Sequence, residues 1–218
     1  MVYPRNASFT GRTGPLKRLA RTLLHVDGSS LVAQTVQGMG GIGKTQLAVE
    51  FVHRYGCFLH GVHWIDAAEP DAIAAEVAAC GDLMAAAQPG PFPERQSAQV
   101  AWTLAAWQRS GPRLIVLDNL EDIKACREWL GKMSGGPLRL LLTTRRQHWP
   151  RDLGLKRLSL DLFTHEESRS FLRQYVDDEA SSTLDRLARR LGHLPLALEL
   201  AARYLDSFQM PRVTGLSV

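Results

Sequence analysis

A glycine-rich segment, Gly38–Thr45 (GMGGIGKT), has the residue types and spacing of a loop that binds a polyphosphate. It fits the Walker A pattern GxxxxGK[ST], in which glycines let the backbone approach the phosphates so that successive N–H groups point at them. Lys44 can reach the β- and γ-phosphates, and the Thr45 hydroxyl can bind Mg²⁺. The sequence therefore predicts a nucleotide site, whose residues are Gly38, Gly40, Gly41, Ile42, Gly43, Lys44, Thr45 and Gln46.

A second candidate lies at the end of the apolar run Leu114–Leu117, which is followed by Asp118 and Asn119. A strand that ends in aspartate is the expected second Mg²⁺-binding element of nucleotide hydrolases with such a loop, so we expect Asp118 and Thr45 to hold the metal. Asn119 stands where many related ATPases carry a second acid that polarises the attacking water. A neutral amide cannot act as that base, so we predict a slow Mg²⁺-dependent ATPase at most.

The third candidate is Arg145, which follows the predicted strand Leu138–Leu142 and two threonines. Such a strand delivers a polar tip beside the phosphate loop, where a guanidinium can sense the γ-phosphate. The neighbouring Arg146 is expected to point elsewhere. The candidate catalytic residues are therefore Lys44, Asp118 and Arg145.

Positioning these residues requires a parallel sheet, and short apolar runs do alternate with helical patterns up to about residue 160. The predicted strands are Leu31–Val36, Val62–Ala67, Leu114–Leu117, Leu138–Leu142 and Arg157–Leu160. The predicted helices are Thr45–Tyr55, Asp71–Leu83 and Gln96–Arg109. Continuous apolar runs such as 138–142 are typical of strands that are buried on both faces.

After residue 160 the pattern becomes helical only. The predicted helices are 164–176, 182–191 and 195–205. Thr164 and Glu167 match a capping box at the start of the first. Gly192 is suited to the left-handed position after the second, and Pro195 is suited to the first turn of the third.

The composition excludes several classes of protein. Apolar residues make up 45% and charged residues 22% of the 218 residues, close to globular averages. No apolar run approaches the ~20 residues needed to cross a bilayer, and the N-terminus has no secretion signal, so we expect a cytoplasmic protein without a membrane partner. Three cysteines without a CxxC pair are expected to be reduced thiols. The net charge of +4 gives little support for nucleic-acid binding.

Other polar and aromatic groups are expected to be structural. His60 and His63 are three residues apart but lack a Cys or Glu partner, so they do not make a convincing metal site. Trp102 and Trp107 lie on one predicted helix and are expected in the core or an interface.

Five motifs in this order carry a family resemblance: Phe9–Arg12 (FTGR), GMGGIGKT, LIVLDN, LLLTTR and Gly192–Leu196 (GHLPL). The set resembles the NB-ARC domain of the STAND class of signal-transduction P-loop ATPases, found in apoptosome proteins, plant immune receptors and bacterial regulators. The resemblance covers about residues 8–206. Two departures from the family pattern are Asn119 and His193, the latter inserted within the GLPL-like segment.

The resemblance implies an α/β fold with a five-stranded parallel sheet of 5-1-4-3-2 order and three layers, over residues 1–160. A helical subdomain, ARC1-like and incomplete, would follow over residues 161–218. It also implies that Phe9, Gly11 and Arg12 contact the nucleoside and that Pro195 packs on adenine. The sequence has no [NT]KxD segment for reading guanine, which likewise favours adenine.

The function implied by this resemblance is a molecular switch in signal transduction. ADP would hold a closed form, and exchange for ATP would open it and permit self-association of the full-length protein. Sensor and effector domains would lie outside this chain, as would the family's winged-helix module. Two alternatives remain: an AAA+-type ATPase that acts on nucleic acid, and a P-loop kinase for a small molecule.

Overall fold

The computed structural model describes residues 3–24, 31–87, 90–109, 111–134, 136–176 and 181–208. The chain divides into two compact units. The first consists of Met1–Asn6, Arg12–Gly40 and Lys44–Leu160, and the second of Ala7–Gly11, Gly41–Gly43 and Asp161–Val218. The predicted end of the helical subdomain, residues 209–218, lies outside the described residues.

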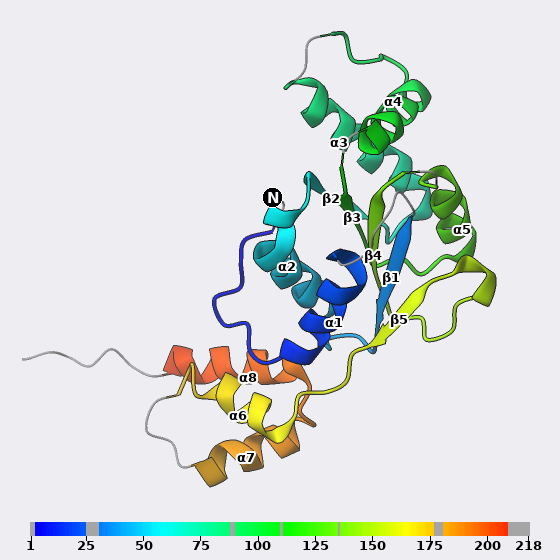
Figure 1. The fold of residues 1–218 in the computed structure, drawn as a ribbon. Helices are drawn as coiled ribbons and strands as arrows, with labels where there is room; N and C mark the ends of the chain where they lie inside the picture. Colours follow the sequence, from blue (N-terminus) through cyan, green and yellow to red (C-terminus); the bar gives the residue numbers. More distant parts are fainter. Residues whose placement is uncertain are drawn as a thin grey trace, which may run out of the picture. The chain divides into compact units, whose positions relative to one another are not determined.

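A five-stranded parallel sheet forms the centre of the first unit (Figure 1). Its strands are β1 (Val32–Gln37), β2 (Gly61–Asp66), β3 (Arg113–Asp118), β4 (Leu138–Thr144) and β5 (Lys156–Ser159). The spatial order is β2-β3-β4-β1-β5. Read from the other edge, this is the predicted 5-1-4-3-2 order, so the predicted fold class is confirmed. Because all strands are parallel, Asp118 at the end of β3 and Thr144 at the end of β4 both lie at the carboxyl end of the sheet.

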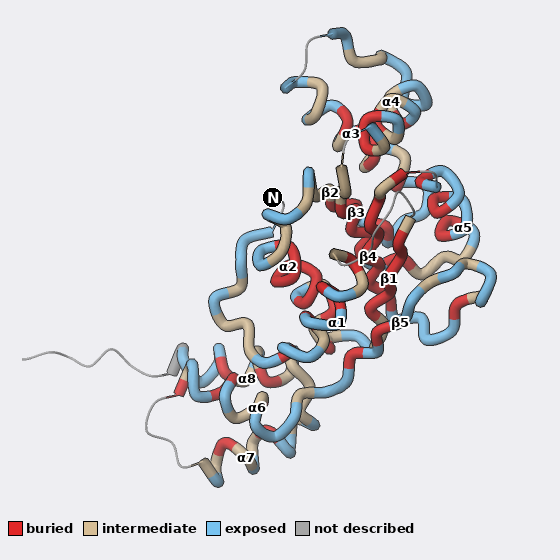
Figure 2. The backbone as a smooth tube through the Cα atoms, in the orientation of Figure 1, coloured by how far each residue is buried: buried red, intermediate tan, exposed pale blue. Residues whose placement is uncertain are grey.

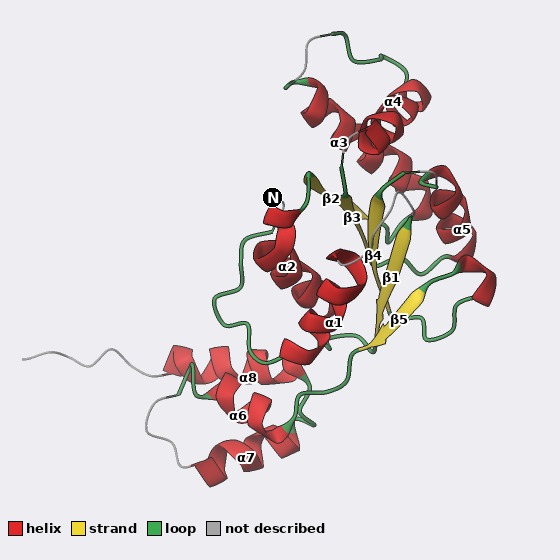
Figure 3. Ribbon diagram, in the orientation of Figure 1, coloured by secondary structure: helices red, strands yellow, loops and turns green. Residues whose placement is uncertain are grey.

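Helices cover both faces of this sheet (Figures 1 and 3). On one face lie α1 (Thr13–Leu24) and α2 (Lys44–Tyr55). On the other face, α5 (Ile123–Lys132) packs on the central strands, with α3 (Ile73–Ala85) and α4 (Gln96–Arg109) beyond β2. The described residues of this unit also form three short 3₁₀ turns: η1 (Gly56–Phe58), η2 (Pro70–Ala72) and η3 (Arg151–Leu153).

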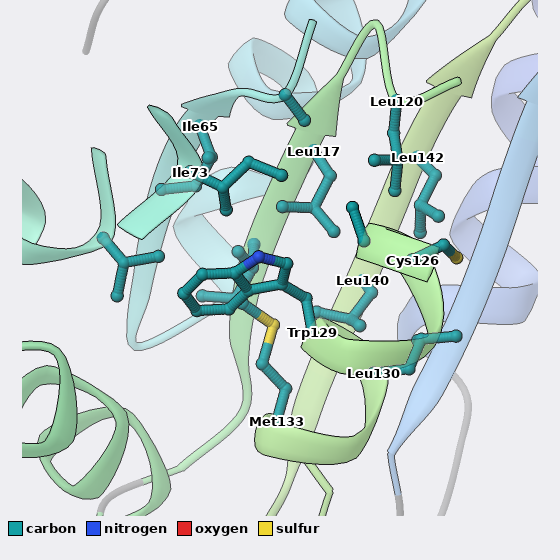
Figure 4. Packing of buried hydrophobic residues seen from close by; sticks show 14 of the residues in the cluster. Ile65, Ile73, Leu117, Leu120, Cys126, Trp129, Leu130, Met133, Leu140 and Leu142 are labelled. Atoms are coloured by element: carbon teal, nitrogen blue, oxygen red, sulfur yellow. The ribbon is translucent and has the colours of Figure 1, made fainter. Parts of the chain in front are cut away.

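The central strands are buried on both faces, which explains their continuous apolar sequences (Figure 2). All seven residues of β4 are buried. Figure 4 shows one side of this core, where Trp129 of α5 and Met133, just after that helix, lie in one cluster with Leu117 of β3 and Leu140 of β4. The sheet is thereby held between two helical layers, and Asp118 and Thr144 lie at the carboxyl ends of its strands.

Two helices of the first unit were not predicted from the sequence. In α1, Leu16, Leu19 and Leu23 are buried at helical spacing within a short, otherwise basic segment. In α5, the side chain of Asp122 caps the first turn by accepting a hydrogen bond from the Ala125 N–H (2.7 Å). The other predicted elements are present with ends shifted by one or two residues, except that the predicted helix 71–83 begins as the 3₁₀ turn η2 and becomes α-helical at Ile73.

The second unit contains α6 (His165–Leu172), α7 (Ser181–Arg190) and α8 (Pro195–Phe208). Its core includes Phe171, Leu172, Leu184, Ala188, Leu198 and Ala202. The predicted capping box is confirmed, since Thr164 and Glu167 exchange both hydrogen bonds. The prediction that this helix runs towards Val176 is wrong: α6 ends at Leu172, and a turn follows.

The junction between α7 and α8 has the expected left-handed geometry. Gly192 has φ of 61° and His193 has φ of 54°. The N–H of His193 returns to the carbonyl of Ala188 (3.0 Å), which closes the end of α7. The histidine ring nitrogen Nδ1 also lies 2.8 Å from the Ser168 hydroxyl on α6. The residue that departs from the family pattern is thus accommodated by contacts within this helical unit.

Candidate nucleotide site

The glycine-rich loop has the backbone geometry that its sequence predicts. Gly41 and Gly43 have φ of 73° and 93°, a region that residues with a Cβ avoid. A Cβ built on Gly40 or Gly43 would meet no atom within 4 Å, so open space adjoins the loop. Helix α2 begins at Lys44 and directs its unpaired N–H groups and positive dipole end toward the loop. Together these features suit a bound anion.

Lys44 is folded back over the loop that precedes it. Its ammonium Nζ donates to the carbonyl oxygens of Gly38 and Met39, each at 2.9 Å. The residue is only 8% exposed, and this burial lowers the pKa of the ammonium. The carboxylates of Glu121 and Asp118 act in the opposite direction and favour its charged form. The lysine therefore belongs to a cluster of charges at the carboxyl end of the sheet.

Thr45 and Asp118, the predicted metal-binding pair, lie in direct contact. The Thr45 hydroxyl donates to Asp118 Oδ1 at 2.9 Å, and Thr143 of β4 donates to the same carboxylate. Asp118 is 3% exposed; burial raises the pKa of its carboxyl, and the hydrogen bonds from Thr143 and Thr45 oppose that change. A hydroxyl and a carboxylate side by side are oxygen donors of the kind that Mg²⁺ prefers.

The fit to Mg²⁺ depends on these two donors together with phosphate oxygens. Within the described parts of the chain, no group of three or more His, Cys, Asp and Glu side chains could hold a metal alone. A metal bound through a P-loop threonine, an aspartate and substrate phosphates does not require such a group. The donor set is therefore compatible with Mg²⁺ that arrives with a nucleotide.

Arg145 lies just beyond β4 and is paired with Glu121, an acid outside the predicted set of site residues. Its Nε is 3.6 Å from Oε1 of Glu121, and its side chain is 72% exposed. Glu121 follows β3 by three residues, and its carboxylate also accepts hydrogen bonds from the end of β4. An acid shortly after one strand and an arginine after another can be matched only once the two strands are known to be neighbours.

Asn119 is exposed and adopts a left-handed backbone with φ of 61°. Asparagine tolerates this conformation better than most residues. Its N–H donates to the Thr143 hydroxyl (2.9 Å), and the next N–H, of Leu120, donates to the Thr143 carbonyl (3.0 Å). The segment after β3 is thereby tied to β4 through its backbone.

The remaining predicted residues fall in both units. In the second unit, Gly11 has φ of 66°, and the N–H of Leu196, just after Pro195, donates to the Gly41 carbonyl (3.2 Å). Phe9 of that unit is half-buried, and Ile42 is 1% exposed.

In the first unit, Arg12 is 7% exposed and has φ of 58°. Gln46 on α2 is exposed and accepts a hydrogen bond from Asn6 (3.1 Å). The Gln46 side chain is thus engaged by the N-terminal segment.

The three cysteines are free thiols: Cys57 is exposed, Cys80 is half-buried and Cys126 is buried. Trp107 is fully buried in the core, whereas Trp102 is half-buried.

None of the described helices is both long and apolar enough to cross a membrane.

Comparison with known proteins places this geometry among P-loop ATPases. No protein-family model matches the chain. The regulatory protein AfsR of Streptomyces griseus is 32% identical over 214 residues, which cover 90% of this chain and 21% of AfsR. The chain thus spans about a fifth of the length of this relative.

Among the solved structures that share the fold are a Cdc6 protein and a STAND protein. Cdc6p of Pyrobaculum aerophilum has a TM-score of 0.70 at 16% identity, and the match covers 95% of this chain and 64% of the Cdc6p chain. A STAND protein with a tetratricopeptide repeat sensor from Pyrococcus horikoshii has a TM-score of 0.54 at 17% identity. This match covers 91% of this chain and 30% of the STAND protein.

The fold and the glycine-rich loop are those of the P-loop class of proteins. Within that class the chain is STAND-like, and the resemblance predicted from its motifs is confirmed by its similarity to AfsR and to a STAND ATPase.

Proposed function

We propose that the chain is an ATP- and ADP-binding switch module of a signal-transduction ATPase. The observation that carries the proposal is the contact between Thr45 and Asp118 beside a lysine held over a glycine loop. This contact joins α2 and β3, which are distant in sequence. A nucleotide bound at a P-loop would have its metal and phosphates beside these two side chains. The similarity to the AfsR regulators supports a role in regulation rather than in metabolism.

Each residue has a defined task in this proposal. The N–H groups of Gly38–Thr45 and the N-terminus of α2 bind the phosphates, and Lys44 neutralises the β- and γ-phosphates. Thr45 and Asp118 hold Mg²⁺, which when bound supplies positive charge that offsets the phosphate oxygens. The Arg145 guanidinium would leave Glu121 and bind the γ-phosphate. Its ion pair with Glu121 is long and exposed and therefore weak.

The helical region has a proposed role on the nucleoside side of the ligand. We assign residues 1–160 to nucleotide binding and residues 161–218 to the helical subdomain. Pro195 and the segment Phe9–Arg12 would hold adenosine. The hydrogen bond from Leu196 to Gly41, within one compact unit, supports a link between the GHLPL segment and the loop.

The switch would be driven by the difference between di- and triphosphate contacts, since a ligand shifts an equilibrium only by its differential affinity for two states. ADP would favour a closed form, and ATP would favour an open form of the full-length protein that self-associates. Sensor and effector functions would belong to other parts of that protein. Hydrolysis would be slow and would reset the switch, because Asn119 offers no base.

Replacement of Lys44 tests this proposal. We expect Lys44→Ala to weaken both ATP and ADP by at least about tenfold, because it removes a buried charge from the phosphate site. Affinity can be measured by calorimetric titration of nucleotide-stripped protein. Lys124→Ala, which removes a lysine from the exposed start of α5, is the matched control. Unchanged nucleotide affinity in Lys44→Ala would rule out the phosphate-loop assignment.

The alternatives of nucleic-acid remodelling and small-molecule phosphorylation make different predictions. The similarity to Cdc6p, at 16% identity, shows a shared fold and does not favour DNA binding by this chain. Turnover stimulated by nucleic acid would support the remodelling alternative. Transfer of the γ-phosphate to a small molecule would support a kinase.

A further inference from the structure

Glu121 forms a bridge between the ends of two neighbouring strands. Its Oε1 accepts from the Arg145 N–H (2.6 Å), and its Oε2 accepts from the Arg146 N–H and the Thr144 hydroxyl (both 3.1 Å). Its backbone carbonyl accepts from Arg146 Nε (2.9 Å). Glu121 alone thus binds three consecutive residues at the end of β4: Thr144, Arg145 and Arg146.

This arrangement uses the carboxylate as a double acceptor rather than as a base. Three donors occupy its two oxygens, and hydrogen bonds to a charged acceptor are stronger than neutral ones. These hydrogen bonds direct both oxygens of the carboxylate at the end of β4. Their geometric effect is to fix the backbone from which the Arg145 side chain projects.

Glu121 also faces the two cations of the site. Its Oε1 lies 3.6 Å from Arg145 Nε. Burial lowers the pKa of Lys44, and among the charged groups Glu121 is the foremost one opposing that change. The acid therefore lies at the place where the terminal phosphate of a triphosphate would compete for both cations.

We propose that Glu121 is a positioning residue that holds the tip of β4 and Arg145 for recognition of the γ-phosphate. This inference rests on the proposed function, in which Arg145 senses that phosphate. The role of Glu121 is distinct from that of Asp118, whose carboxylate faces Thr45 and Thr143. In this proposal, the discrimination between triphosphate and diphosphate depends on Glu121, which does not itself bind the nucleotide.

The sign of the effect separates positioning from simple electrostatics. Removal of a negative charge near the phosphates would by itself favour the triphosphate, which carries more negative charge. Loss of positioning would instead disfavour it. Gln in place of Glu121 keeps the size, but an NH2 donor replaces one of the two acceptor oxygens. Because the N–H groups of Arg145 and Arg146 bind different oxygens, one of them loses its acceptor. Asp keeps the charge but is one methylene too short to reach them.

The experiment is to measure the affinities of ATPγS and ADP, with Mg²⁺, for Glu121→Gln, Glu121→Asp, Arg145→Ala and the double variant Glu121→Gln/Arg145→Ala. We expect each Glu121 variant to lower the preference for ATPγS over ADP by about fivefold, the effect of roughly one lost charged hydrogen bond. In the Arg145→Ala background the Glu121→Gln change should no longer lower the preference for ATPγS, since positioning acts through Arg145. Glu128→Gln, which removes an exposed acid of α5, is the control for charge.

An unchanged or increased preference for ATPγS in both Glu121 variants would overturn the inference, as would an additive effect in the double variant. Circular dichroism and thermal melting identify a variant that fails to fold, and Glu121→Asp then serves in place of Glu121→Gln. If Arg145→Ala itself leaves the preference unchanged, the sensor role in the proposed function has failed. If only the Glu121 variants leave it unchanged, the sensor stands and the positioning role has failed.

Discussion

The hydroxyl of Thr45 lies 2.9 Å from a carboxylate oxygen of Asp118, although 73 positions separate them in the chain. Thr45 lies in the first turn of α2 and Asp118 ends β3. The contact exists because the loop after β1 and the end of β3 meet at the carboxyl end of a parallel sheet. This arrangement is typical of the ligand sites of open α/β sheets.

The Thr45–Asp118 pair predicts a specific dependence on Mg²⁺. In the unmodified protein, Mg²⁺ should increase the affinity for ATP, and in Thr45→Val this increase should fall by about tenfold, since changes around a bound metal typically cost that much or more. Titrations with and without EDTA measure it. The matched control is Thr103→Val, which removes a buried hydroxyl from α4. A normal Mg²⁺ dependence in Thr45→Val would argue against the metal assignment.

Asn119 predicts that hydrolysis is limited by a missing base. Turnover should be below about 1 s⁻¹, the low end for typical enzymes. Asn119→Asp introduces a carboxylate at a backbone conformation that aspartate also tolerates, and we expect it to raise turnover by at least about tenfold. Phosphate release under saturating ATP measures both rates. Rapid turnover in the unmodified protein would contradict the account, and so would an unchanged rate in Asn119→Asp.

Arg145 predicts selective loss of triphosphate binding. Its replacement by alanine should weaken ATPγS by about tenfold and leave ADP within about twofold, because only the triphosphate presents a γ-phosphate. Competition titrations with a fluorescent nucleotide measure the two affinities. Arg151→Ala, at another exposed arginine after the same strand, should change neither. Equal weakening of both nucleotides by Arg145→Ala would show that it is not a γ-phosphate sensor.

His63 predicts a loss of stability in mild acid. Burial, reinforced by the nearby Arg113, lowers the pKa of this histidine to about 4 from its ordinary value of 6.5. Between these values the unfolded chain binds the proton and the folded chain does not, so the free energy of unfolding should fall as pH decreases from 6.5 towards 4. The loss should be on the order of 2 kcal/mol, reduced because the ring is only partly buried.

Urea unfolding at several pH values measures this effect. His63→Gln should remove the corresponding part of the pH dependence, because glutamine does not titrate. His148→Gln, at an exposed position, should leave it in place. An unchanged pH profile in His63→Gln would show that other groups are responsible.

The sequence was informative where one element alone determines the structure. The strands could be predicted because residues buried on both faces form continuous apolar runs, as in β4. The glycine loop could be predicted because its backbone geometry demands Gly41 and Gly43. Helices α1 and α5 escaped prediction because each is short and its apolar residues become evident as a buried face only against the sheet.

The missing part of the site depends on how the turn after β3 meets the end of β4. Glu121 acts on Thr144, Arg145 and Arg146, which lie 23 to 25 positions further along the chain. The predicted strand order makes β3 and β4 neighbours, but the contact also requires the turn after β3 to bring Glu121 to the end of β4, and no local sequence pattern specifies that turn. Long-range polar pairing of this kind becomes visible only with the folded sheet.

The most direct test of the switch is the nucleotide that the protein retains. Purified protein should be denatured and the released nucleotide identified by chromatography, alongside titration of the stripped protein with ADP. The account predicts ADP at about one per chain, or saturable ADP binding that Lys44→Ala removes. Protein that releases no nucleotide and does not bind ADP at millimolar concentration would contradict it.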